Sequence, residues 1–374
     1  MLPKVGLSVL PAEDLRMAQL PLFAAGLVEA VEWTIDAEFE AELPSWVAPL
    51  LDHYAARGAL YGHGVQFSPL SAVFEPRQAE WLAQASHALG KRTYRHVSEH
   101  FGFSTGPGLT RSAPLPLPFA PPSVAIGRDR LRLLQGAASG VSVGLENLAL
   151  SMSRDDVLAQ GEFLDELLEP TNGFLLLDLH NVYCQSENFN VPADELALAM
   201  PLHRVRELHV SGGSWSSVKT PVGSAPFRRD THDGAVPEAV FALLAFVIPR
   251  CPLLEVVFLE RLGNTLNSPS DVLQYRADYA RLRAVAGARG TTKGGGSSRA
   301  VTNRTAGSMD DAGLAALQAA LVNAFRSASS AEEAFSLLTA APLSAAAQRW
   351  ISASDPRSIE TAIALVQRWA ELDQ

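Results

Sequence analysis

The sequence has only two cysteines, Cys184 and Cys251, in 374 residues. Two cysteines cannot form a disulfide framework, and such low usage is typical of proteins of the reducing cytoplasm. The apolar segment LLAFVIP (residues 243–249) is far shorter than the ~20 residues of a transmembrane helix. The start, MLPKVGLSVLPAEDL, contains no apolar run of signal-peptide length. We therefore expect a soluble cytoplasmic protein that has no membrane partner.

The sequence also lacks an excess of positive charge. It has 30 Lys and Arg against 40 Asp and Glu, which gives a formal net charge of -10. Phosphate backbones require a basic face, so this balance argues against nucleic acid as the main substrate. It does not argue against a metal site, because carboxylate ligands themselves add negative charge.

Strand-like and helix-like segments alternate from residue 5 to about residue 285. Alternation of this kind predicts a parallel sheet, and eight such units predict closure into an α/β (β/α)8 TIM barrel. Residues 101–123 form a long Pro- and Gly-rich connection, which is typical of a functional loop or lid at the rim. The expected strands are Val5–Leu10, Leu27–Trp33, Leu60–Phe67, Arg92–Val97, Val141–Glu146, Phe174–Leu179, Val205–Val210 and Leu253–Leu259.

The composition changes after residue 286. Residues 287–308 are small, polar and without periodicity, which predicts a flexible linker. Residues 309–374 are Ala-rich with helical periodicity, so we expect a small all-α bundle of three or four helices beside a barrel domain of residues 1–286. Such a small unit is marginal alone and is expected to dock on the barrel or on a partner. Its helix caps are expected at Asp310, at Ser330, and at Asp355 or Ser358.

Metal-binding residue types recur where the predicted strands end. In a TIM barrel these ends share one rim, where buried charges need partners that metal ions can supply. Each such histidine alone is more often a hydrogen-bonded core residue, but their joint placement predicts a metal site. The candidate ligands are His63, His100, Glu146, Asp178, Asn181, His209, Asp230, His232 and Glu260.

The ligand types and their number indicate the kind of metal site. Imidazoles and carboxylates without a thiolate set suit zinc, iron or manganese. Asp230 and His232 lie on one face of an extended segment, so both can reach one ion. Glu146 can bridge two ions through its two oxygens. More than six ligands are too many for one ion, and we expect two or three.

Four further residues are expected beside the ligands. Glu99 and Asn147 are adjacent to ligands and are expected to orient them. Glu32, at the end of the second strand, is expected to contact substrate or to form a salt bridge at the rim. His180 would face away from the site if its segment stayed extended, so it is a second choice to Asn181.

Several phrases resemble one known family. They are GLSVLP, HGVQFS, SEH, GLENL, LLDLHNVY, ELHVSGG, DTHDG and the final strand Glu. Residues 3–285 thereby resemble the multinuclear non-heme iron-dependent oxidases, the DUF692 or methanobactin-biosynthesis MbnB-like family. This family lies within the superfamily of TIM barrels related to endonuclease IV and xylose isomerase. The endonuclease branch has His where this sequence has Asn181.

The resemblance implies a function and a grouping of the ligands. One iron would be held by His63, His100 and Glu146, and another by Glu146, Asp178, His209 and Glu260. Asn181, Asp230 and His232 would surround a third position. The family uses mixed-valence iron and dioxygen to oxidise side chains, often Cys, of ribosomally made precursor peptides, and a small partner protein usually recognises the leader.

Other functions stay open at this point. A zinc- or manganese-dependent hydrolase or sugar isomerase could use the same barrel, and a non-enzymatic metal-storing scaffold is a further alternative. The C-terminal bundle would replace or supplement the leader-recognition partner, or be a passive appendage.

Overall fold

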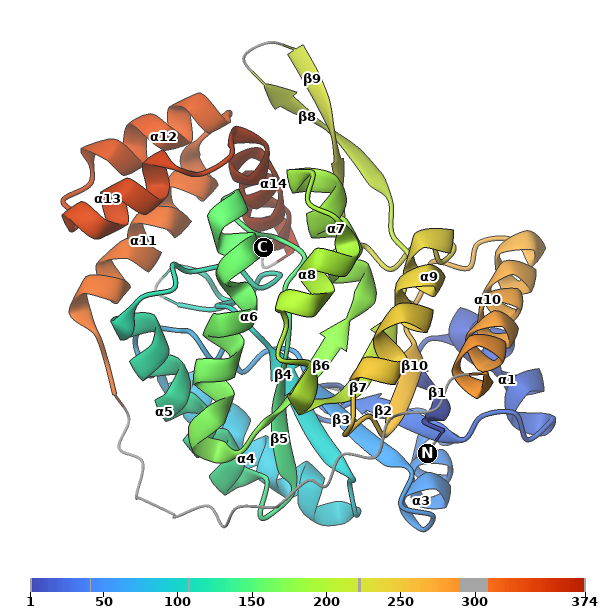
Figure 1. Cartoon of the computed structure of the whole chain (residues 1–374). Helices are drawn as coiled ribbons and strands as arrows, with labels where there is room; N and C mark the ends of the chain where they lie inside the picture. Colours follow the sequence, from blue (N-terminus) through green and yellow to red (C-terminus); the bar gives the residue numbers. More distant parts are fainter. Residues whose placement is uncertain (1, 41, 107, 221–222, 289–308, 373–374) are drawn as a thin grey trace.

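The computed structural model describes residues 2–40, 42–106, 108–220, 223–288 and 309–372. Its core is formed by eight parallel strands: β1 (Lys4–Val9), β2 (Ala30–Thr34), β3 (Leu60–Gly64), β4 (His96–His100), β5 (Ser142–Glu146), β6 (Phe174–Asp178), β7 (Val205–Val210) and β10 (Val256–Leu259). They close into a barrel in the order β1-β10-β7-β6-β5-β4-β3-β2 (Figure 1). The predicted (β/α)8 fold is confirmed.

Helices surround the barrel, as a parallel sheet with both faces covered requires. They are α1 (Glu13–Ala24), α2 (Ala37–Glu40), α3 (Val47–Ala55), α4 (Pro76–Lys91), α5 (Pro121–Ala137), α6 (Arg154–Leu168), α7 (Leu179–Phe189), α8 (Ala193–Ala199), α9 (Glu238–Val247) and α10 (Pro269–Gly287). No helix in the described part of the chain is both long and apolar enough to cross a bilayer.

The barrel interior is filled by large side chains that meet across it. Tyr61 packs against Phe258 with ring centroids 5.3 Å apart, and His96 lies 4.2 Å from Phe174. This filling explains why residue 6 is glycine: a Cβ there would lie 2.3 Å from the Phe258 ring. The interior is therefore a packed core below the rim, as in other barrels of this type.

Two strand assignments from the sequence need correction. The fourth strand runs over His96–His100 and not Arg92–Val97, because α4 continues to Lys91 and residues 92–95 connect it to the barrel. An antiparallel hairpin of β8 (Trp215–Thr220) and β9 (Gly223–Arg228) was not predicted. It projects from the rim beyond β7 (Figure 1), and its Ser-rich strands lack the apolar run of a barrel strand.

Four helices follow the barrel: α11 (Ala312–Ser327), α12 (Ala331–Ala340), α13 (Ala345–Ser352) and α14 (Pro356–Leu372). Ser330 caps α12 as predicted, and Asp355 accepts a hydrogen bond from the Arg357 backbone N–H at the start of α14. The predicted cap at Asp310 is wrong. Asp311 caps α11, while the Asp310 carboxylate accepts from the Phe74 backbone N–H at 2.7 Å. Of the predicted linker, residues 289–308 lie outside the described residues.

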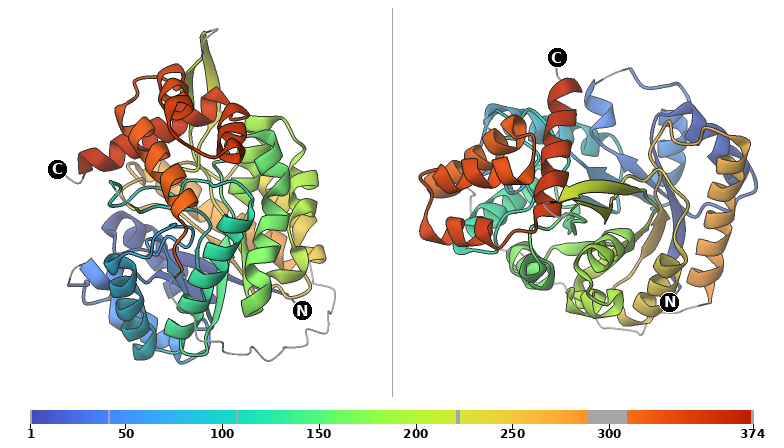
Figure 2. Two further views of the ribbon diagram at one scale, coloured as in Figure 1. Left: turned by 90° about the vertical axis from the view of Figure 1, so that its left-hand side faces the viewer. Right: turned by 90° about the horizontal axis from the view of Figure 1, so that it is seen from above.

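The four helices pack on the barrel through buried polar contacts. The Gln318 side chain, 2% exposed, donates to the Leu70 carbonyl at 2.7 Å and accepts from the Ala72 N–H at 2.9 Å. The Asp355 N–H donates to the Met152 carbonyl, and the Trp350 indole donates to Asp156. Seen from above, α14 lies beside the β8–β9 hairpin (Figure 2). The C-terminal helices thus reach the rim at the carboxyl ends of the strands.

Replacing Gln318 tests this packing. Gln318→Ala leaves the Leu70 carbonyl and the Ala72 N–H buried without partners, at about 1–3 kcal/mol for each unsatisfied group. Urea titration should show a lower free energy of unfolding, by about 2 kcal/mol or more. The control is Gln84→Ala on the surface of α4, where the side chain bonds only Glu80, and its effect should stay within about 0.5 kcal/mol. Equal effects would contradict the role given to Gln318.

Candidate metal centre

Side chains of the alternating positions in each strand point into the barrel. On β4 these are His96, Ser98 and His100, and on β7 they are Glu207 and His209. His100 and His209, the last inward-facing residues of these two strands, lie at or near the carboxyl ends of the strands. Strand register therefore brings distant parts of the sequence together at one rim.

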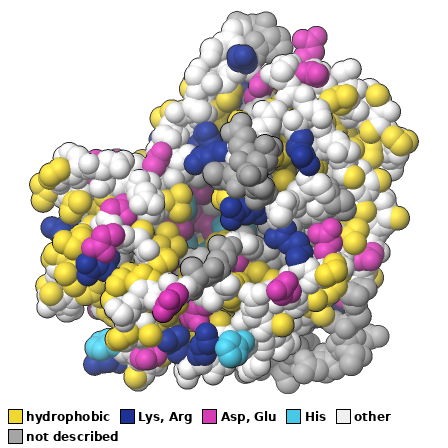
Figure 3. Space-filling view, turned by 180° about the vertical axis from the view of Figure 1, so that it is seen from behind, with side chains coloured by type: hydrophobic (Ala, Val, Ile, Leu, Met, Phe, Trp, Pro, Cys, Tyr) yellow, Lys and Arg dark blue, Asp and Glu magenta, His cyan; other side chains and the backbone are white. Residues whose placement is uncertain are grey.

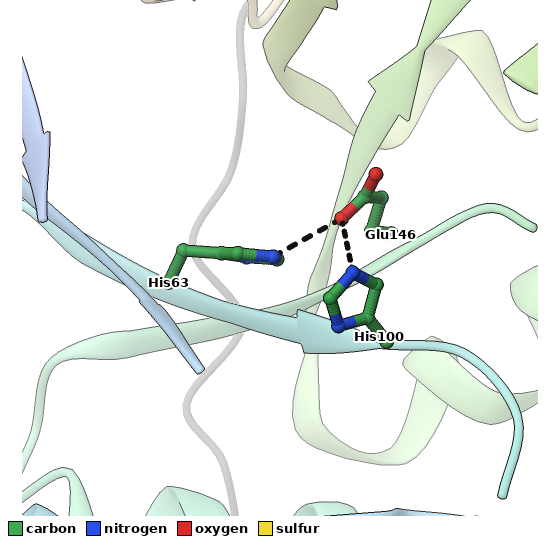
Figure 4. Close-up of side chains that lie close together, drawn as sticks. All are labelled: His63, His100 and Glu146. Atoms are coloured by element: carbon green, nitrogen blue, oxygen red, sulfur yellow. Dashed lines mark ion pairs between the residues drawn. The ribbon is translucent and has the colours of Figure 1, made fainter. Parts of the chain in front are cut away.

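His63, His100 and Glu146 form the first group of candidate ligands. The Nε2 atoms of His63 and His100 lie 3.2 and 3.4 Å from the same Glu146 oxygen, Oε2 (Figure 4). These residues end β3, β4 and β5 or lie one position before the end. Two imidazoles aimed at one carboxylate oxygen surround a small volume that a metal ion could occupy.

Glu146, Asp178, His209 and Glu260 form a second group. One ligand atom from each lies within 4.8 Å of the others. Glu146 belongs to both groups, so its carboxylate lies between them. Two adjacent groups that share a carboxylate have the arrangement of two-metal sites.

Of the remaining candidates, Asp230 and His232 join no comparable group of carboxylates and imidazoles among the described residues. His232 Nε2 lies 2.7 Å from Asp230 Oδ1, and its Nδ1 lies 3.3 Å from Glu260 Oε1. The backbone of His232 is left-handed with φ 49°, a conformation that costs free energy for a residue with a side chain. Asn181 instead contacts Glu146, to whose Oε1 its Nδ2 donates at 3.3 Å.

Three residues hold the candidate ligands in place. Ser98 Oγ lies 2.8 Å from His63 Nδ1. Glu32 Oε1 lies 3.0 Å from His209 Nε2, which leaves Nδ1 of that ring toward Glu260. Asn147 exchanges two hydrogen bonds with the Asp178 backbone, at 2.7 and 3.1 Å. Contacts of this kind fix the orientation of metal-binding side chains.

The structure places three further residues beside the candidate ligands. Glu32 is 1% exposed, and its carboxylate lies 3.0 Å from His209 Nε2, so it forms an ion pair with a candidate ligand. The segment after Asp178 does not stay extended, because α7 begins at Leu179. His180 therefore turns toward the site, with Nδ1 2.8 Å from Asp230 Oδ1. Glu99 accepts the backbone N–H of His100, while the side-chain atoms of the two residues stay 3.8 Å apart.

The charges in this cluster perturb one another strongly. Burial disfavours charged groups, yet Glu146 and Glu99 outweigh it and raise the pKa of His100 to about 9. Burial, Asp230 and Glu146 together raise the pKa of Asp178 well above its usual range. Without cations, carboxylates and protons must therefore share the site, and metal uptake would release protons.

A buried pair below the site was missed by the sequence analysis. Glu207 Oε2 lies 2.5 Å from His96 Nε2, and neither side chain is exposed. Burial and Glu32 raise the pKa of Glu207 well above its usual range, and burial lowers the pKa of His96. A neutral pair thus closes the bottom of the centre. Glu207 lies two residues before His209 on one strand, and that spacing could have placed it inside.

Two unsatisfied atoms test whether the residues suit a metal. Asp178 Oδ2 and Asn181 Oδ1 are buried and have no hydrogen-bond partner in the described part of the chain. Buried polar atoms are normally satisfied, so the position of these oxygens beside imidazoles fits a bound cation. The combined donor set of nitrogen and oxygen fits iron, zinc or manganese.

A pocket leads from this cluster to the surface. His100, Asn181 and Asp230 line its inner end, and apolar side chains such as Leu148 and Phe227 line its walls. Helix α14 contributes Thr361 and Leu365. The C-terminal helices therefore form part of the entrance to the candidate centre.

Comparisons with known proteins agree with the resemblance seen in the sequence. Residues 29–281 match the sequence model of the family described as "RiPP precursor modification enzyme MbnB/TglH/ChrH". A UPF0276 protein of Caulobacter vibrioides is 28% identical over 231 residues, which cover 61% of this chain and 77% of the relative. A UPF0276 protein of Pseudomonas aeruginosa is 30% identical over 219 residues, covering 57% and 74%.

Solved structures share the fold. A xylose isomerase-like TIM barrel/4-hydroxyphenylpyruvate dioxygenase fusion protein superposes with a TM-score of 0.50 at 14% sequence identity, covering 76% of this chain and 43% of the other. At this identity the likeness concerns the barrel alone.

The contact between Asn147 and Asp178 gives a testable prediction. In Asn147→Asp the donor that faces the Asp178 carbonyl becomes an acceptor, and a charge is added beside other carboxylates. We expect a loss of about 2–4 kcal/mol in unfolding free energy without metal, measured by urea titration. Asn172→Asp, at an exposed left-handed position, makes the same chemical change and should have little effect. Equal stability of both variants would exclude a positioning role for Asn147.

Proposed function

Because the chain belongs to the family of RiPP precursor modification enzymes MbnB/TglH/ChrH, we propose that it is a multinuclear non-heme iron-dependent oxidase. In this proposal it uses dioxygen to modify a side chain, Cys in the first instance, of a ribosomally synthesised precursor peptide. The family match itself shows that the chain belongs to a family of enzymes that modify RiPP precursors.

The proposed ligand sets follow the groups of side chains at the rim. His63, His100 and Glu146 would hold one iron, and Glu146, Asp178, His209 and Glu260 a second. Asn181, Asp230 and His232 would surround a third position. The observation that carries the proposal is the sharing of Glu146 by two adjacent groups, since a shared carboxylate suits a centre of more than one ion.

Bound iron would supply one-electron redox chemistry with dioxygen, which no side chain offers by itself. The protein's own residues would position the metal ligands and shield the centre from water. Ser98, Glu32 and Asn147 hold His63, His209 and Asp178 through the contacts described above. The apolar walls of the pocket exclude water and would hold the peptide segment next to His100 and Asp230.

The C-terminal helices have a place in this proposal as a small domain of residues 309–374. Thr361 and Leu365 of α14 line the pocket, so the domain would contact the peptide and supplement or replace a separate leader-recognition partner. Two free, buried cysteines agree with a reducing compartment, and we place the reaction in the cytoplasm.

Glu146 gives a first test. Glu146→Ala removes a ligand from both groups and should lose more than one equivalent of metal, measured by elemental analysis of anaerobically purified protein. Two to three irons are expected in the unmodified protein. Circular dichroism should show the same fold in both.

The matched control is Glu162→Ala on the exposed side of α6, which should keep its full metal content. Full metal retention in Glu146→Ala would remove Glu146 from the centre.

Dioxygen gives a second test. Turnover of the precursor peptide should consume dioxygen, and the aerobic protein should show a ferric charge-transfer band. Bound zinc together with activity that continues under strict anaerobiosis would contradict the oxidase and favour a hydrolase on the same barrel.

A further inference from the structure

Two consecutive arginines line the pocket next to the candidate ligands. Arg228 ends β9 and Arg229 follows it, and both face the pocket that His100 and Asp230 line at its inner end. The chain as a whole carries a net charge of -10, and these two cations stand next to the acidic side chains of the candidate centre. No step of the proposed metal chemistry uses them.

Arg228 is held rigidly. It is buried, and its guanidinium lies over the rings of Tyr183 and Trp215, 5.4 and 5.6 Å from their centroids. Its Nη2 donates to His180 Nε2 at 3.1 Å, while its buried Nε has no partner among the described residues. Within the described part of the chain no carboxylate forms a salt bridge with it. The guanidinium of Arg228 is thus held in a fixed position without a carboxylate partner among the described residues.

Arg229 is half-buried beside it. In the described part of the chain its side chain makes no hydrogen bond and no salt bridge. The adjacent Asp230 carboxylate is engaged by His180 and His232.

Basic side chains are also seen on the surface of the molecule. Dark-blue Lys and Arg side chains surround a hollow in which acidic and histidine side chains are seen (Figure 3). Arg111, from the connection between β4 and α5, lies over Trp369 of α14, the helix that also contributes Thr361 and Leu365 to the pocket. A desolvated cation without a partner costs free energy, and a carboxylate compensates a guanidinium best because it can bind both nitrogens at once.

We propose that Arg228 and Arg229 form a carboxylate-binding subsite for the substrate, with Arg229 as the principal contact. The ligand would be an acidic side chain or the C-terminal carboxylate of a peptide, bound so that a neighbouring residue reaches His100 and Asp230. That the ligand is a peptide rests on the proposed function. The anion subsite itself requires neither metal nor turnover.

Binding of short probe peptides tests the subsite in the full chain. The probes are Gly-Glu-Gly-Glu-Gly amide, Gly-Gln-Gly-Gln-Gly amide, and the Gln peptide with a free C-terminal carboxylate, each with a neutral fluorophore at the N-terminus. Fluorescence anisotropy should show at least about tenfold tighter binding of one or both carboxylate probes than of the neutral one. The two carboxylate probes distinguish a side chain from a C-terminus. Equal binding of all three would overturn the proposal.

Two variants and a control assign the effect to Arg229. Arg229→Gln should lose at least about tenfold in affinity for the carboxylate probe, and Arg229→Lys should lose less because it keeps the charge. Arg132→Gln, on the exposed face of α5, makes the same change in net charge and should bind as the unmodified protein does. Equal weakening by Arg132→Gln would mean that only overall charge matters, and the proposal would fail.

Stability and metal content separate ligand binding from a structural role. Arg229→Gln removes an uncompensated charge, so its melting temperature should be unchanged or higher. Its metal content should equal that of the unmodified protein. A lower melting temperature or lost metal would show that Arg229 supports the fold or the centre instead. Failure of the proposed oxidase would be seen separately, in the metal and dioxygen measurements on the unmodified protein.

Discussion

The structure depends on a concentration of carboxylates and imidazoles in a nearly dry space at one end of a barrel. Such groups cannot all be charged there without compensation. In the metal-free chain protons provide it: the pKa values of His209 and His232 are raised by neighbouring carboxylates that outweigh burial, and that of Asp178 is raised by burial and by Asp230. Acids and imidazoles form short pairs here, such as His209 with Glu260 and His232 with Asp230. The site has more hydrogen-bond acceptors than its bound protons can satisfy. Such a site is suited to binding cations.

The surrounding protein makes this arrangement possible. The neutral Glu207–His96 pair and the filled barrel below it form a rigid floor, and Glu32 holds His209 from that side. Asn147 ties the ends of β5 and β6 together, so the positions of Glu146 and Asp178 are linked. Rigid support matters because it fixes which nitrogen of each imidazole points toward the common volume at the rim.

Much of this architecture could be predicted from the sequence, for a definite reason. The barrel strands are short apolar runs. A polar residue at the end of such a run lies at the shared rim, because all parallel strands of the barrel end there. The fourth strand was misplaced because Arg92–Arg95 reads as extended but only connects α4 to the barrel. The β8–β9 hairpin has no apolar run to reveal it. Glu207 was missed although its spacing from His209 places it inside the barrel, because the partner that makes its burial possible, His96, is far away in sequence.

The position of the C-terminal helices could not be read from local pattern, and it changes how the site is understood. An amphipathic helix predicts a buried face but not the surface that covers it. Here Gln318 supplies the hydrogen bonds that two barrel backbone groups lack, and α14 then brings Thr361 and Leu365 to the pocket wall. The entrance is thus shared by segments that lie on both sides of residues 289–308. A change in how these helices pack on the barrel would therefore alter access to the centre even though every candidate ligand lies in the barrel itself.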